Sequence, residues 1–306
     1  MEKLSYGTHE DWLELRKTGI GGSDAAAILG VSRFKSPFGV YCDKLGISPP
    51  QEDNPVLRIG TYLEEYVARL FSEASGLKVH RVNTTYRSSD HPFMLANVDR
   101  AIVGEKAILE CKTTTHRNNV DWDSGEIAPE YFCQVQQYLA VTGYDHGYLG
   151  VLFREDGAFK WFKIERDEQY IDALIQAEEA FWDRVVNRLP PDPDGLDNDT
   201  QTLKRLYPVG DGSEMDLTTI SDVMYNRMEL DKNIKALEKE RDRLDNIVRA
   251  TLGDAVMGSA GSVSVTYKPQ TRSGVDTEKL KTEFPTVYAQ VQKQSVSRTM
   301  RYKEVK

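Results

Sequence analysis

The chain has 306 residues, of which 40% are hydrophobic and 28% charged, ordinary values for a globular protein. No apolar run approaches the roughly 20 residues that a membrane span needs, and the first residues lack the apolar core of a signal peptide. We therefore expect a cytoplasmic protein with no membrane contact, built from one sizeable domain and an appendage.

The net charge of −9 is unfavourable for long-range attraction to nucleic acid. The charge is unevenly spread, because the segment from Lys268 to Lys306 has nine Lys and Arg against four Asp and Glu, a net of +5 that leaves −14 elsewhere. The three cysteines have no CxxC spacing, so we predict neither a disulfide framework nor a zinc or iron–sulfur cluster.

Two short helices joined by a glycine-rich turn are predicted at the N-terminal end. The first begins at His9, and the second runs from about Asp24 to Leu29 with Ser23 as its N-cap. Exposed amides at a helix N-terminus, the Ser23 hydroxyl and the Arg16 guanidinium are suited to binding a phosphate. Simple capping, with Arg16 on a solvated face, is the alternative.

Two further helices follow before the first strands. Ser36 and Pro37 predict a helix that ends before Gly46. A longer helix is predicted from about Pro55 to Ala74, and it carries Glu64 close to its apolar stripe. That acid is either a solvated residue beside the stripe or part of a site.

A hairpin with acidic residues in apolar strands is the most informative stretch. The runs 96–103 and 107–113 flank a short turn. Because strand side chains alternate, Glu110 and Lys112 share one face, and Asp99 lies on the neighbouring strand. Charges on a buried strand are costly unless they are paired or bound to metal, so the hairpin predicts a functional site. An ordinary surface Glu–Lys pair is the alternative.

The chemistry available to this hairpin follows from its donor atoms. Two carboxylates that converge with a strand carbonyl form an all-oxygen site suited to Mg2+ or Mn2+. Lys112 is placed to orient or deprotonate an attacking water, since metal-bound water is already acidified. The sequence therefore predicts metal-assisted hydrolysis at Asp99 and Glu110.

A helix over about 129–141 follows the hairpin and a polar loop. Gln134 and Tyr138 stand four residues apart and so project from one side of it. A buried amide satisfied by backbone groups is the alternative for Gln134. The remaining predicted elements of this domain are strands over 147–153 and 159–164 and a helix over 167–187.

This order of elements predicts an α/β fold with a mixed central sheet flanked by helices. The proline-rich stretch after residue 188 predicts a boundary. We therefore expect a domain over 1–188, a linker over 189–213 and an extension over 214–306.

The extension begins with a long helical pattern over about 217–252. Its apolar residues repeat every seven positions, which predicts a partner surface within this chain, in another subunit or in another protein. They are Val223, Leu230, Leu237 and Leu244. Strands over 262–268 and 295–303, separated by a short helix capped by Asp276, complete the predicted extension.

Four segments of the chain together resemble the YqaJ-type viral recombinase and lambda phage exonuclease-like family of the PD-(D/E)xK nuclease superfamily. They are residues 12–26, residues 60–65, the hairpin with Asp99 and Glu110-Cys111-Lys112, and residues 134–138. Four segments in the family's order are more specific than any one of them.

The resemblance implies a PD-(D/E)xK restriction-endonuclease-like core and roles for its residues. Asp99, Glu110 and the Cys111 backbone carbonyl would hold Mg2+, with Mn2+ as a possible substitute. Glu64 would complete the metal shell, and Lys112 would position or activate water. The positions implied to approach the catalytic site or bind the 5′ phosphate and DNA are Gln134, Tyr138, Arg16, Ser23 and Arg117.

The implied activity is a metal-dependent 5′-to-3′ exonuclease that degrades one strand of linear double-stranded DNA, preferably from 5′-phosphorylated ends, and leaves 3′ overhangs for single-strand annealing recombination. A ring-shaped homotrimer and an annealing partner of the RecT or Red beta type are also implied, in a phage or prophage protein of a bacterial host. The alternatives are an endonuclease or end-trimming nuclease of the same superfamily, and a non-catalytic DNA-binding adaptor.

Overall fold

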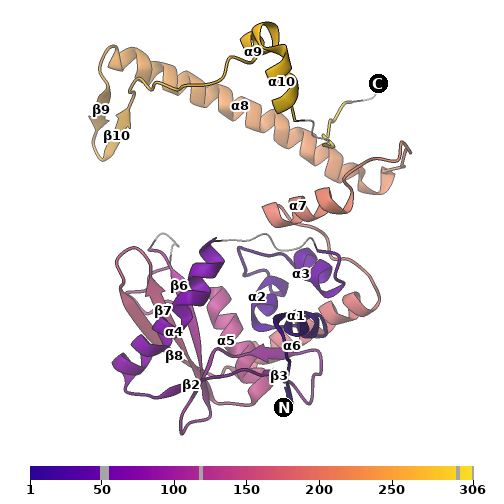
Figure 1. The fold of residues 1–306 in the computed structure, drawn as a ribbon, viewed down its shortest axis with the longest axis vertical. Coiled ribbons are helices and arrows are strands. Elements are labelled where there is room, and N and C mark those ends of the chain that lie inside the picture. Colours follow the sequence, from indigo (N-terminus) through magenta and orange to yellow (C-terminus); the bar gives the residue numbers. More distant parts are fainter. Residues whose placement is uncertain (49–54, 117–119, 294–296, 305–306) are drawn as a thin grey trace. The chain divides into compact units, whose positions relative to one another are not determined.

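The computed structural model describes residues 1–48, 55–116, 120–293 and 297–304. The chain divides into two compact units, Met1–Leu206 and Tyr207–Lys306, both drawn in Figure 1. No helix in the described part of the chain has the length and apolarity needed to cross a membrane.

A five-stranded mixed sheet is the centre of the first unit. Its strands lie in the order β2-β5-β6-β7-β8. Strands β6 and β7 are parallel and every other neighbouring pair is antiparallel. Helix α5, Pro129–Thr142, connects the parallel pair, as a parallel pair requires a crossover. The strands are β2 Val79–Arg81, β5 Arg100–Ile102, β6 Ala107–Thr114, β7 His146–Phe153 and β8 Phe159–Glu165.

Helices pack on both faces of this sheet, which confirms the predicted fold class (Figure 1). Alternate residues of β6 face opposite helices. Leu109 joins Phe71 of α4, Pro55–Ser75, in one buried cluster, whereas Ile108 joins Val135 of α5 in another. The alternation therefore directs Glu110 and Lys112 toward the α5 side of the sheet.

The predicted single strand over 96–103 is wrong, because the chain changes sheets within it. Strand β4, Leu95–Asn97, pairs in a separate antiparallel sheet with β3, Thr85–Arg87, which also pairs with β1, Glu2–Leu4. The carboxylate of Asp99 accepts a hydrogen bond from the Cys111 N–H at 2.8 Å. A side chain thus replaces the backbone acceptor at this point, and the ladder between β5 and β6 begins at Arg100.

Three helices precede α4, and the second differs from its prediction. They are α1 His9–Lys17, α2 Gly22–Ile28 and α3 Pro37–Lys44. Ser36 caps α3 as predicted, accepting from the Gly39 N–H at 2.8 Å. Ser23, however, does not cap α2, because the helix already begins at Gly22 and Gly21 is its N-cap; the Asp24 carboxylate in the first turn accepts from the Gly21 N–H at 3.2 Å.

The first unit extends beyond the boundary predicted at residue 188. Helix α6, Glu168–Val186, is followed by α7, Asp197–Leu206, within the stretch 189–213 that the sequence predicts to be a linker. The Ser36 hydroxyl donates to the fully buried Asp199 carboxylate at 2.5 Å. This buried contact attaches α7 to α3 and makes it part of the first unit.

The second unit is built on helix α8, Ser221–Leu252, preceded by the short 3-10 helix Thr218–Ile220. The predicted strand over 295–303 is wrong in its described part, since residues 297–304 contain no strand, and β10 pairs with β9 alone among the described strands. Asp276 caps α9 as predicted. The other elements are β9 Met257–Ala260, β10 Val263–Thr266, α9 Thr277–Glu283 and α10 Pro285–Val291.

The apolar stripe of α8 is exposed to solvent. Val223, Leu230, Leu237 and Leu244 are 64%, 57%, 71% and 50% exposed. Within the second unit, the described residues therefore provide no surface that covers this stripe.

Candidate functional site

The step between β4 and β5 brings the predicted hairpin residues together. Glu110 lies on β6 and is only 3% exposed. Its Oε1 atom is 2.6 Å from Lys112 Nζ. Asp99 is attached to the same strand through the Cys111 N–H. The surface-pair alternative is wrong, because the Glu110 carboxylate is buried in the sheet.

Helix α5 contributes two polar side chains to the same place. The side-chain amide of Gln134 donates to Glu110 Oε1 at 2.7 Å and to the Tyr138 hydroxyl at 2.8 Å. Both residues are buried. The Gln134 side-chain amide therefore hydrogen-bonds to groups of the site. The alternative, in which backbone groups satisfy this amide, is not what the structure shows.

The electrostatics of the cluster favour a bound cation. Burial and the nearby Glu110 raise the pKa of Asp99 well above its usual range. Burial also raises the pKa of Glu110, although Lys112 opposes this. Burial lowers the pKa of Lys112, but the Glu110 and Asp99 carboxylates outweigh it and raise this pKa to about 12. The cluster therefore contains two closely spaced carboxyl groups, those of Asp99 and Glu110, beside the protonated Lys112.

The donor atoms of this cluster fit a hard divalent cation. Glu110 Oε2 is buried and has no hydrogen-bond partner among the described residues. Such an oxygen beside the Asp99 carboxylate suits Mg2+ or Mn2+. In the described part of the chain, no three His, Cys, Asp or Glu side chains are already grouped closely enough to coordinate a metal ion. Glu110 and Glu64 contact cationic side chains instead.

The third predicted carboxylate, Glu64, contacts Arg100 at the start of β5. Its Oε1 atom is 2.5 Å from a terminal nitrogen of Arg100, and that nitrogen also donates to the Asp99 carbonyl at 2.7 Å. The charge of Glu64 raises the pKa of both Asp99 and Glu110, so it acts on both acids from α4. The neighbouring Glu65 pairs with the other terminal nitrogen of Arg100 at 2.9 Å.

Two contributors to the site were not identified from the sequence. Arg100 is 2% exposed on β5, and the signal that could have found it is a charged residue directly after Asp99 in an apolar run. The other contributor is Tyr131 on α5, because Lys112 Nζ lies 5.4 Å from the centre of its ring.

The glycine-rich turn before α2 lies against the same helix α5. A Cβ atom on Gly22 would stand 2.7 Å from Gln134 Cγ and 2.8 Å from Tyr138 Cε1. Only a residue without a side chain allows this approach. The N-terminus of α2 therefore lies directly beside two residues that surround Glu110.

The predicted phosphate-binding residues flank this turn. Ser23 is exposed in the first turn of α2. Arg16 is half-buried, with its guanidinium 4.8 Å from the centre of the Trp12 ring, and its carbonyl accepts from Lys44 Nζ at 2.9 Å. The predicted DNA-binding residue Arg117 lies outside the described residues.

Comparison with known proteins identifies a family for the chain. A model of the YqaJ-like viral recombinase domain matches residues 11–145. The chain is also 38% identical over 311 residues to the uncharacterized protein YqaJ of Bacillus subtilis strain 168, a match that spans 100% of this chain and 97% of that protein. The chain belongs to the YqaJ-like viral recombinase family.

Solved structures similar to this YqaJ-like chain include two exonucleases. An alkaline exonuclease from Laribacter hongkongensis is 20% identical, with a TM-score of 0.48, and the match covers 65% of this chain and 98% of that one. A phage-related exonuclease from Haemophilus somnus 129PT is 15% identical, with a TM-score of 0.45, covering 58% of this chain and 99% of that one.

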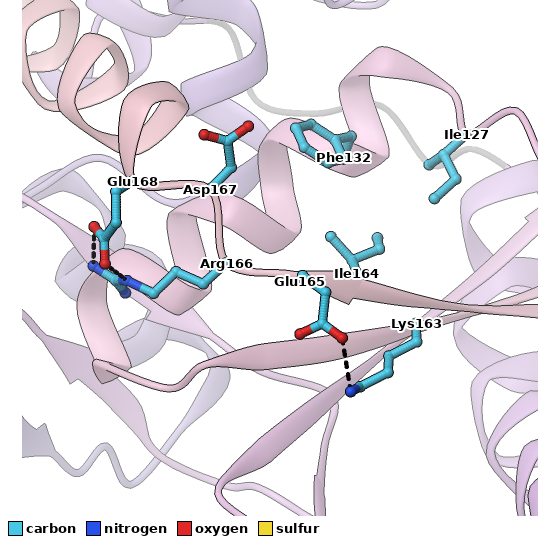
Figure 2. A pocket seen from close by; sticks show the side chains of 8 residues that line it. All are labelled: Ile127, Phe132, Lys163, Ile164, Glu165, Arg166, Asp167 and Glu168. Atoms are coloured by element: carbon cyan, nitrogen blue, oxygen red, sulfur yellow. Dashed lines mark hydrogen bonds and ion pairs between the residues drawn. The ribbon is translucent and has the colours of Figure 1, made fainter.

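A separate concavity of about 450 Å³ in the YqaJ-like chain contains none of the predicted site residues. Figure 2 shows that four of its charged side chains pair with one another, Arg166 with Glu168 and Lys163 with Glu165. The fifth, Asp167, accepts from the Tyr170 N–H and caps α6. These contacts occupy the charged side chains of the concavity, so we assign it no part in the site.

Proposed function

We propose that the protein is a metal-dependent 5′-to-3′ exonuclease that degrades one strand of linear double-stranded DNA and leaves 3′ overhangs for single-strand annealing recombination. The observation that carries this proposal is the buried cluster of Asp99, Glu110 and Lys112, in which Glu110 Oε2 has no partner among the described residues. Membership of the YqaJ-like viral recombinase family supports the same interpretation.

Asp99, Glu110 and the Cys111 carbonyl would hold Mg2+, with Mn2+ as a substitute and Glu64 completing the shell. When bound, such an ion polarises the scissile phosphate and acidifies the attacking water. Gln134 donates to Glu110 Oε1 and so leaves Oε2 available to the cation. Tyr138 accepts from the same amide and fixes its orientation.

Lys112 has a positioning role in this mechanism. Its Nζ atom lies 2.6 Å from Glu110 Oε1 and 5.4 Å from the centre of the Tyr131 ring, and both neighbours favour the charged ammonium form. An ammonium group donates hydrogen bonds and accepts none. We therefore assign Lys112 the orientation of the water or of a phosphate oxygen, in preference to proton removal.

The 5′ phosphate would bind at the N-terminus of α2, through Ser23, Arg16 and backbone amides of that turn. The contact of Gly22 with Gln134 and Tyr138 supports this, since that helix end lies beside the catalytic cluster. A homotrimeric ring around the DNA would retain an acidic chain on its substrate. An annealing protein of the RecT or Red beta type would receive the exposed strand.

The test is degradation, with Mg2+, of linear duplexes carrying 5′-phosphate or 5′-hydroxyl ends, beside covalently closed circular DNA. We expect loss of linear DNA only, faster with the phosphate. Lys112→Ala is expected to slow the reaction about 100-fold or more, as loss of one hydrogen-bond donor to the transition state does. Lys106→Ala removes an exposed lysine from the turn of the same hairpin and is expected to leave the rate unchanged.

Two other outcomes support the alternative functions. Cutting of the closed circle would replace the exonuclease with an endonuclease of the same superfamily. Absence of cleavage in every substrate, with either Mg2+ or Mn2+, would favour a non-catalytic DNA-binding adaptor.

A further inference from the structure

Arg100 is a buried cation at the edge of the carboxylate cluster. Its side chain is 3% exposed, and one of its terminal nitrogens contacts two groups at once, the Glu64 carboxylate and the Asp99 carbonyl. Glu64 belongs to α4 and Asp99 to the step before β5. One guanidinium nitrogen therefore connects two separate elements that each carry an acid of the site.

We propose that Arg100 is a positioning residue for the metal site, which fixes Glu64 beside Asp99 and Glu110 and leaves its second oxygen for the cation. The inference rests on the metal site of the proposed function. Arg100 touches neither the ion nor the DNA in this arrangement. It acts through Glu64.

The burial of the contact supports this role. Arg100 is almost inaccessible to water, whereas the Glu64 side chain is 23% exposed and the Glu65 side chain 81% exposed. A buried guanidinium that also bonds to the backbone has little freedom to move. It therefore restricts Glu64 to one position, and groups that orient metal ligands typically change metal affinity about 10- to 100-fold when removed.

The faces of the sheet explain why such a residue is needed. Arg100 is paired with Leu109, whose side chain packs against α4, so the guanidinium lies on the α4 side. Glu110 faces α5 on the other side. A carboxylate from α4 can approach the cluster only where the ladder between β5 and β6 begins, beside Asp99, and Arg100 holds it there.

The experiment is a calorimetric titration of the full chain with Mn2+, without DNA. Arg100→Gln is expected to weaken Mn2+ binding about 10- to 100-fold. The same substitution in a Glu64→Gln background is expected to cause no further loss, because the contact is already gone. Glu65→Gln removes the other carboxylate partner of Arg100 and is expected to bind Mn2+ as the unmodified chain does.

Arg100→Lys separates charge from geometry. The lysine keeps the positive charge but lacks the planar fork, so we expect it to weaken binding as Arg100→Gln does. Thermal unfolding shows whether each variant is folded. If Arg100→Gln does not fold, Arg100→Lys replaces it in the titration. Unchanged or tighter binding in the Arg100 variants would overturn the proposal, as would an equal loss in the Glu64→Gln background.

Failure of the metal site itself is distinguishable from failure of this inference. Asp99→Asn is expected to abolish Mn2+ binding. If the unmodified chain binds no Mn2+, or if Asp99→Asn binds it normally, the metal site of the proposed function is wrong. If both of these controls behave as expected and Arg100 has no effect, only the positioning role is wrong.

Discussion

The pKa values of two buried acids outside the catalytic cluster are shifted in opposite directions. Glu178 on α6 is fully buried, and burial raises its pKa well above the usual range, although a hydrogen bond from Gln137 opposes this. Asp24 is equally buried, but Lys44, Lys35 and Arg16 outweigh the effect of burial and hold its pKa well below the usual range. Neighbouring charges, and not burial alone, decide the direction of each pKa shift.

Glu178→Gln is expected to stabilise the protein increasingly as the pH rises. The native pKa of Glu178 is raised, so its contribution is fully present below the unfolded pKa of about 4.3 and is lost as the pH rises toward the native pKa. The advantage of the variant should grow by at most about 1.4 kcal/mol per pH unit. Urea unfolding between pH 5 and pH 8 measures this difference.

Glu179→Gln is the matched control, because Glu179 is the exposed neighbour of Glu178 on the same helix. Its stability curve is expected to run parallel to that of the unmodified chain. A difference between Glu178→Gln and the unmodified chain that stays constant with pH would show that Glu178 is ionised in the native protein.

At the scale of single residues, the sequence predicted contacts between residues that lie close together in the chain. Strand alternation placed Glu110 beside Lys112, and helical spacing placed Gln134 beside Tyr138; only the family resemblance brought the two pairs to one site. Arg100 could not be assigned a role, because its partners include Glu64 on a distant helix. The start of α2 was predicted too late, because the helix begins at Gly22 and the Asp24 carboxylate bonds to the Gly21 N–H before it.

Helix α2 approaches helix α5 very closely at Gly22. Gly22 stands against Gln134 and Tyr138 with no room for a Cβ atom. Gly22→Ala is therefore expected to destabilise the protein by about 1–3 kcal/mol, as overpacking of a tight contact does. The free energy of unfolding in urea measures the loss.

Gly60→Ala is the comparison within α4. Among the described residues, a Cβ atom there meets only Thr113 Oγ1, at 3.9 Å, which is an ordinary contact. Because alanine favours a helix interior over glycine by about 0.5–1 kcal/mol, this variant is expected to be neutral or more stable. Equal effects of the two substitutions would contradict the tight packing at Gly22.

Most elements were predictable because their patterns are periodic or capped. The bounds of α3, α5, α6 and α9 follow capping residues or apolar spacing in the sequence. The division between β4 and β5 was not predictable, since the apolar pattern continues through Val98. A side-chain hydrogen bond between Asp99 and another strand decides where the ladder begins.

For the whole molecule, the end of the first unit is the feature that differs most from the sequence prediction. A chain ending at Leu206 is expected to unfold cooperatively, whereas one ending at Arg188 should lose about 2 kcal/mol or more of its free energy of unfolding. It loses the buried contact of Ser36 with Asp199, and hydrogen bonds to charged groups contribute about 1.5–3 kcal/mol. Urea unfolding of both chains measures the difference, and equal stability would contradict it.

The sequence could not show what covers α8. Its seven-residue repeat predicted a long helix with an apolar stripe, and the structure confirms the helix over Ser221–Leu252. None of the described residues from 207 onward is buried. The repeat shows that one face of the helix is apolar, and it does not specify which surface covers that face.

The step between Asn97 and Arg100 also limits how this chain can vary over evolution. A substitution there alters one side chain, whereas a change in length alters every contact that follows. Inserting or deleting one residue would turn Arg100 to the opposite face of β5, away from Glu64, and would move Asp99 out of reach of the Cys111 N–H. Homologous chains should therefore keep a constant number of residues in this segment even where the residues themselves differ.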